Sequence, residues 1–207
     1  MMEELDLLKK DWKKNESSFE QVSEVAIYKM IHQKSSSIVK WILIISILEV
    51  LLWTGISFFY NSDDYLKKMH SEYLIDYFKY ITAFNYFVIA VFIYKFYRNY
   101  KAISTITATK KLMSDIMKTR KTVQYYVWYN LGMIVISMII GFTLVFTVDP
   151  KMHQLASKNN ALLLMILFCT ICILIIVGVF WLFYRLVYGI LLQKLYKNFN
   201  ELKKIDS

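Results

Sequence analysis

The stretch that decides the fold is Ala161–Tyr184, ALLLMILFCTICILIIVGVFWLFY, in which no charged residue interrupts 24 positions. A helix needs about 20 such residues to cross a hydrocarbon core about 30 Å thick. Three further stretches are long and mostly apolar, at residues 38–59, 78–97 and 125–148. The sequence therefore predicts an all-α, polytopic membrane protein with four transmembrane helices.

The remaining segments are too short for a large soluble domain. The chain has 207 residues, of which 57% are hydrophobic, and a mean hydropathy of +0.39. Outside the four spans we expect an amphipathic helical tail at 1–37, an inner loop at 98–124 and a C-terminal helix at 185–207. Ser23 is a plausible N-cap for a helix in the tail. We expect the second, third and fourth spans to continue as helices beyond the bilayer, with the tail helices packed among them.

The basic residues predict the orientation. Of the 25 lysines and arginines, 20 fall in the tail, the inner loop and the C-terminal segment, or at the span ends that adjoin them. Lysine and arginine near span ends mark the cytoplasmic side. Both termini are therefore expected to be cytoplasmic. The first 35 residues are charged and contain no signal-peptide core, so the first span is expected to act as the insertion signal.

Glu49 is the strongest candidate for a functional residue within the membrane. It lies 11 residues into the first span, which places it about 16 Å from the inner end and near mid-membrane. A charged acid there costs at least about 2.5 kcal/mol, so it should be neutral, paired or in a polar cavity. One interpretation is a proton or ion site, and the other is a protonated, structural carboxyl for which Glu49→Gln retains most function. Antiparallel spans would bring Glu49 into one polar layer with Asn85, Ser137, Thr170, Cys169 and Cys172.

Other residue patterns do not favour catalysis or metal binding. The pair Cys169 and Cys172 spells CxxC, but it lies within an apolar helix, where packing is the expected use. The three histidines, His32, His70 and His153, are expected on opposite sides of the membrane. Neither a phosphate-binding loop nor a nucleophile motif is found in the chain, so we predict no catalytic, cofactor-binding or metal-binding residues. Tyrosines and tryptophans near span ends are interpreted as an interfacial belt; they include Trp53, Tyr126 and Tyr184.

The tail is the candidate partner-binding element. Apolar side chains recur there at helical spacing, as an amphipathic helix laid in a partner's groove requires; they are Leu5, Leu8, Trp12, Ile27, Met30 and Ile31. The alternative is that these helices lie on the membrane or pack against the protein's own helices. Both alternatives stay open from the sequence.

The N-terminal quarter resembles a known group of proteins. The residues that carry the likeness are Leu5-Asp6-Leu7-Leu8-Lys9-Lys10-Asp11-Trp12, Val22-Ser23-Glu24 and Lys34-Ser35-Ser36-Ser37-Ile38-Val39-Lys40-Trp41-Ile42. They resemble small bacterial inner-membrane proteins whose genes often lie beside one for an extracytoplasmic-function sigma factor. The resemblance implies a membrane-tethered regulator, with anti-sigma activity through its cytoplasmic tail, in a bacterial cytoplasmic membrane. Relatives are sometimes labelled beta-carotene monooxygenase, but such oxygenases resemble β-propellers with four iron-binding histidines, and this chain has three.

Taken together, the residues and the resemblance favour a non-enzymatic regulatory or scaffold protein that acts on its cytoplasmic face. Its expected partners are the lipid bilayer and a cytoplasmic protein, either a sigma factor or a subunit of a membrane complex. A homo-oligomer is also compatible with the sequence, whereas direct nucleic-acid binding is not expected. The principal alternative is a small transporter or channel that uses Glu49, and a membrane enzyme is a weaker one.

Overall fold

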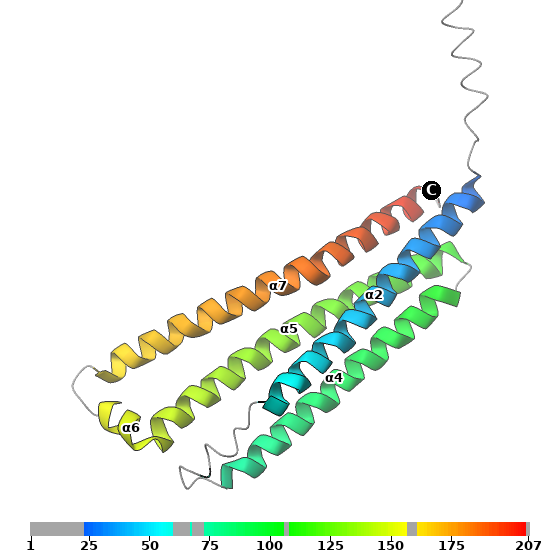
Figure 1. Cartoon of the computed structure of the whole chain (residues 1–207). Helices are drawn as coiled ribbons and strands as arrows, with labels where there is room; N and C mark the ends of the chain where they lie inside the picture. Colours follow the sequence, from blue (N-terminus) through cyan, green and yellow to red (C-terminus); the bar gives the residue numbers. More distant parts are fainter. Residues whose placement is uncertain (1–22, 60–66, 68–72, 106–107, 157–160, 206–207) are drawn as a thin grey trace, which may run out of the picture.

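The computed structural model describes residues 23–59, 67, 73–105, 108–156 and 161–205 (Figure 1). Its long helices are α2 (Glu24–Phe59), α4 (Tyr73–Thr105), α5 (Thr109–Val148) and α7 (Ala161–Ile205), and α6 (Pro150–Ala156) is short. All four long helices are long and apolar enough to cross a membrane, and the described residues include no strand. The prediction of an all-α, polytopic membrane protein with four transmembrane helices is confirmed.

The four long helices form an antiparallel bundle. Each contacts the next along the chain, and α7 returns to contact α2, so that α2 and α5 face each other diagonally and touch little. One end of the bundle holds the start of α2, the end of α4, the start of α5 and the end of α7 (Figure 1). We call it the basic end, because the residues there are rich in lysine. The opposite end carries α6 and is called the α6 end.

The helices run well beyond the predicted spans. The segment from Glu24 joins the first span in a single helix, and the Ser23 hydroxyl caps it by accepting a 3.2 Å hydrogen bond from the Ala26 amide. The prediction that Ser23 is an N-cap is confirmed. The inner loop expected at 98–124 is mostly helix, because α4 continues to Thr105 and α5 begins at Thr109. The expected helical extensions of the second, third and fourth spans are therefore present.

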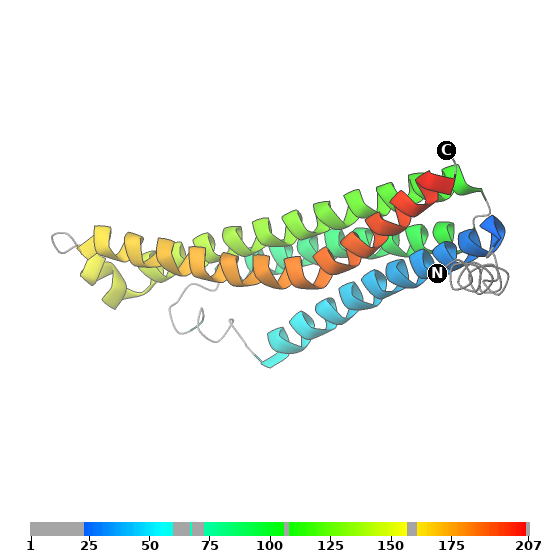
Figure 2. The ribbon, with the colours of Figure 1, turned by 90° about the horizontal axis from the view of Figure 1, so that it is seen from above.

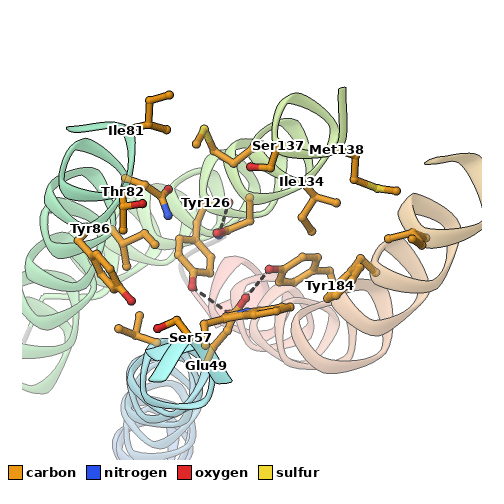
Figure 3. Close-up of a pocket in the computed structure, with 18 residues that line it drawn as sticks. Glu49, Ser57, Ile81, Thr82, Tyr86, Tyr126, Ile134, Ser137, Met138 and Tyr184 are labelled. Carbon is orange, nitrogen blue, oxygen red and sulfur yellow. Dashed lines mark hydrogen bonds between the residues drawn. The ribbon is translucent and has the colours of Figure 1, made fainter. Parts of the chain in front are cut away.

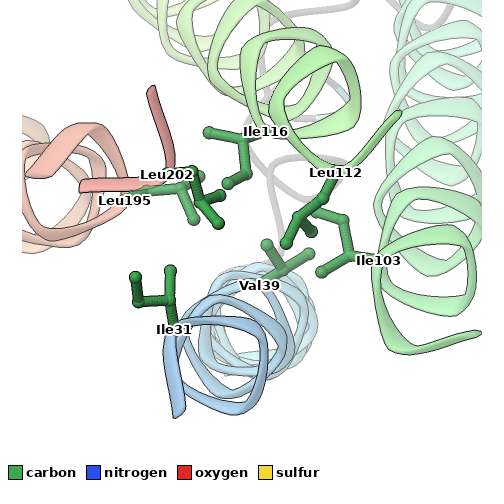
Figure 4. Packing of buried hydrophobic residues seen from close by; sticks show 7 residues of the cluster. All are labelled: Ile31, Val39, Ile103, Leu112, Ile116, Leu195 and Leu202. Atoms are coloured by element: carbon green, nitrogen blue, oxygen red, sulfur yellow. The ribbon is translucent and has the colours of Figure 1, made fainter. Parts of the chain in front are cut away.

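The basic end has a core of its own, in which all four long helices meet (Figure 4). We call it the basic-end core; it consists of Ile31, Val39, Ile103, Leu112, Ile116, Leu195 and Leu202. Several of these residues come from the inner segment at 98–124. Burial of their side chains explains why that segment is helical, since an amphipathic helix is stable when its apolar face is covered.

A second buried cluster lies next to the first, toward the α6 end. This aromatic core consists of Ile42, Phe96, Val123, Tyr126, Leu131, Tyr184 and Tyr188. Beyond it the bundle opens, because α2 diverges from the other helices and ends early (Figure 2). From Glu49, α2 continues for only about 15 Å, whereas α5 continues for about 33 Å beyond Tyr126, the residue that contacts Glu49.

Candidate functional site

Glu49 lies where α2, α5 and α7 meet, and three tyrosine hydroxyls surround its carboxyl group. Figure 3 shows two of them, those of Tyr126 and Tyr184. Tyr126 of α5 donates a 2.9 Å hydrogen bond to Oε2, and Tyr188 of α7 donates a 3.3 Å bond to the same oxygen. Tyr184 of α7 donates to Oε1. Two oxygens offer about four acceptor positions, so three donors nearly satisfy an ionised carboxylate. If the carboxyl carries a proton, one of these bonds reverses direction.

Aromatic packing holds the tyrosines in place. The ring of Tyr126 is buried and makes edge contacts with Phe96 at 5.4 Å, Phe92 at 5.5 Å and Tyr188 at 5.9 Å between ring centroids. Tyr184 and Tyr188 lie four residues apart on α7, so both present their rings to one side of the helix. Because these rings are packed, the hydroxyls are positioned before any ligand arrives.

A cavity of about 440 Å³ opens on the α6 side of Glu49. All four long helices line it, and Glu49, Tyr126 and Tyr184 stand at one of its walls (Figure 3). Most of the wall is apolar or aromatic, including Trp53 and Phe180, whose ring centroids are 5.6 Å apart. The cavity lies along the part of α2 that diverges from the other helices, and Val50, Trp53 and Ser57 line it from α2 (Figure 2).

The structure shows how Glu49 is placed relative to the predicted spans of the other helices. Its partners Tyr126 and Tyr184 are the second residue of the third predicted span and the last residue of the fourth, and Tyr188 lies beyond that span. Glu49 is therefore level with the basic-side ends of those spans, and not with their middles. The first predicted span is therefore shifted along the bundle axis relative to the third and fourth.

The predicted polar layer is divided. Asn85 and Ser137 line the same cavity as Glu49, and Asn85 also accepts a 3.0 Å hydrogen bond from the Tyr129 hydroxyl. The Thr170 hydroxyl donates instead to the Ile166 carbonyl of its own helix. Thr170 is about 21 Å along α7 from Tyr184, and both cysteines lie in the same distant turns as free thiols. These three residues therefore lie too far along α7 to share a polar layer with Glu49.

The candidate partner-binding residues of the tail have different surroundings. Leu5, Leu8 and Trp12 lie outside the described residues. Ile31 is only 3% exposed within the basic-end core, and Ile27 packs against that core. Both isoleucines therefore pack against the protein's own helices, and a buried side chain is not available to a partner while the bundle is closed. Met30, at 45% exposed, remains on the surface.

The three tyrosines were missed as site residues. Tyr126 and Tyr184 were interpreted as members of an interfacial belt, and no role was predicted for Tyr188. The spacing of Tyr184 and Tyr188 was a usable signal, since residues four apart share a helix face. Their pairing with Glu49 depends on the register between helices, which span boundaries do not define.

Glu49 has no cationic partner among the described residues. The ion pairs found there join Lys79 to Asp76 and Lys118 to Asp115, and both lie within single helices. Nor does the described part of the chain contain a group of three or more histidine, cysteine, aspartate or glutamate residues suited to a metal ion. What the site offers chemically is an acid with three hydroxyl donors beside an aromatic cavity.

Residues 25–207 match the family described as a domain of unknown function, DUF8845. The chain belongs to this family. The match covers the described helices from the second residue of α2 onward. Neither the curated proteins nor the solved structures gave a match.

Proposed function

We propose that this protein is a non-enzymatic membrane regulator that senses a lipophilic organic cation through the Glu49 cavity and signals at its cytoplasmic face. The observation that carries the proposal is the carboxyl of Glu49, held by tyrosines from two other helices at the wall of an aromatic cavity. In the proposed cycle, the three tyrosine hydroxyls hold the resting carboxylate in place, and a bound cation pairs with it.

The chemistry of the wall favours a cation with an apolar body. A carboxylate attracts the charge, and the faces of Trp53, Tyr86 and Phe180 add cation–π attraction of about 0.5 to 2 kcal/mol each. The apolar remainder of the wall suits hydrocarbon or aromatic rings. A neutral lipid would leave the carboxylate without a counter-charge, and an anion would be repelled by it.

The same helices link the site to the basic end. α2 carries Glu49 and also Ile31 of the basic-end core, and α7 carries Tyr184 and also Leu202. A ligand that separates Glu49 from the tyrosines would change the angle between two rigid helices whose far ends pack together. The output would be a changed basic end, read by a cytoplasmic protein such as the expected sigma factor or complex subunit.

Two ions of matched shape test the ligand class. Tetraphenylphosphonium and tetraphenylborate differ in sign of charge but have nearly the same size. We expect the purified full chain to bind the phosphonium and not the borate in calorimetric titrations. Binding should weaken as the pH falls, because protonation of Glu49 removes the attracting charge.

Variants of Glu49 provide the control. Glu49→Gln should weaken phosphonium binding roughly tenfold or more, since it removes the opposite charge and keeps the shape. Asp76→Asn removes an exposed acid of α4, paired with Lys79 at 3.8 Å, and should leave binding unchanged. Equal binding of both ions, or unchanged binding by Glu49→Gln with a normal unfolding temperature, would refute the proposed ligand class.

A small transporter is the second candidate, and the cavity that reaches Glu49 favours it. Transport toward the basic end would require both buried cores to open, because they close the bundle on that side. Uptake of the aromatic cation ethidium into proteoliposomes under a pH gradient separates the two functions. Uptake by the wild type that Glu49→Gln abolishes would establish transport, whereas binding without uptake supports the regulator.

A further inference from the structure

We propose that a groove between α2 and α7 at the basic end binds the phosphate headgroup of an anionic membrane lipid. The groove has a volume of about 410 Å³ and is separate from the Glu49 cavity, with which it shares no lining residue. The residues that line it include Lys34, Ser37, Trp41, Lys194, Lys197 and Glu201.

The charges in the groove select an anion. Three lysines face one glutamate, which leaves a net charge of +2. None of the three lysines is within 4.0 Å of a carboxylate among the described residues, where the ion pairs involve other side chains. Their ammonium groups, the Ser37 hydroxyl and the Trp41 indole N–H are all hydrogen-bond donors, as phosphate oxygens require.

The groove is built on a rigid wall. Asn198 of α7 donates a 3.0 Å hydrogen bond to the Ser35 hydroxyl of α2, and both residues are buried. Leu195 and Val39, from the same two helices, pack in the basic-end core. Because these contacts join α2 to α7 directly behind the groove, the lysines are presented from a fixed pair of helix faces.

The position of the groove identifies the phosphate as part of a lipid. Trp41 is the first large exposed apolar residue of the membrane-crossing part of α2, and exposed Ile190 and Leu186 continue from the groove along α7. An acyl chain can follow these side chains while the headgroup meets the lysines. Basic pockets between transmembrane helices at the cytoplasmic surface bind anionic headgroups in this way.

Lipid titration of the purified full chain tests the inference. Phosphatidylglycerol added to the protein in detergent should raise its unfolding temperature and remain bound in native mass spectra. Phosphatidylcholine with the same acyl chains should do neither. The stabilisation should decline as salt is added, because the contact is ionic.

Matched charge variants locate the site. Replacing Lys34, Lys194 and Lys197 with glutamine should weaken phosphatidylglycerol binding roughly tenfold or more. Replacing Lys101, Lys111 and Lys121, which are exposed and lie outside the groove, makes the same change of charge and should have little effect.

Two further measurements test for misfolding and for a soluble ligand. Glu201→Gln removes the one acidic side chain of the groove and should tighten binding, a gain that misfolding cannot produce. Glycerol 3-phosphate, which carries a phosphate but no acyl chain, tests whether a soluble phosphate is the ligand. The inference is overturned if both phospholipids act alike, if the control variant loses as much as the groove variant, or if glycerol 3-phosphate stabilises as well as the lipid.

Discussion

Removing the hydroxyl of Tyr126 tests how much its hydrogen bond to Glu49 contributes to stability, separately from the packing of the ring. Tyr126→Phe keeps the edge contacts with Phe92 and Phe96 and loses only the 2.9 Å bond to the carboxyl. Hydrogen bonds between membrane helices contribute about 0.6 kcal/mol on average and at most about 1.7, and those to charged groups about 1.5–3. We expect Tyr126→Phe to lower the free energy of unfolding by about 1–2 kcal/mol.

Tyr126→Ala should cost more, about 3–5 kcal/mol, because it also removes a ring that is only 1% exposed and leaves a cavity. Unfolding by titration with sodium dodecyl sulfate in mixed micelles, followed by tryptophan fluorescence, measures each value. The neighbouring Tyr125 is 67% exposed, so Tyr125→Phe is the control and should change stability by less than about 0.5 kcal/mol.

A double-mutant cycle decides whether Glu49 is the partner that matters. In a Glu49→Gln background the cost of Tyr126→Phe should shrink by about 1 kcal/mol, since the charged acceptor is already gone. Should the cost be the same in both backgrounds, the hydroxyl acts through something other than Glu49. Equal losses for Tyr126→Phe and Tyr125→Phe would also refute the reasoning.

Three other outcomes are expected. Leu202→Ala should lower stability by about 2–5 kcal/mol, because Leu202 is fully buried in the basic-end core, whereas Leu186→Ala, at a 63% exposed position, should cost little in the same unfolding assay. The variant Asp206→Cys, in a chain without its native cysteines, should resist labelling by an impermeant maleimide added to intact cells; efficient labelling would contradict a cytoplasmic C-terminus. The double change Leu8→Ala and Trp12→Ala should weaken capture of a cytoplasmic partner by more than about tenfold; undiminished capture with a lower unfolding temperature would make the tail structural.

The sequence by itself determined the fold class. Uninterrupted apolar segments such as Ala161–Tyr184 have few stable forms other than membrane-crossing helices, because a backbone in lipid must satisfy its own hydrogen bonds. Ser23 could likewise be predicted as a cap, since capping depends on residues close in the chain. Local patterns of this kind carry their structural consequence within a few turns of helix.

The level of Glu49 required the tertiary structure. An apolar span defines which residues lie in the membrane, but it leaves the helix free to slide along and rotate about its axis, since lipid covers any apolar face equally well. Packing against neighbouring helices removes that freedom. The contacts of Glu49 with Tyr126, Tyr184 and Tyr188 come from residues 77 to 139 positions away. Only the packed bundle could therefore bring an isolated acid and three tyrosines together in one site.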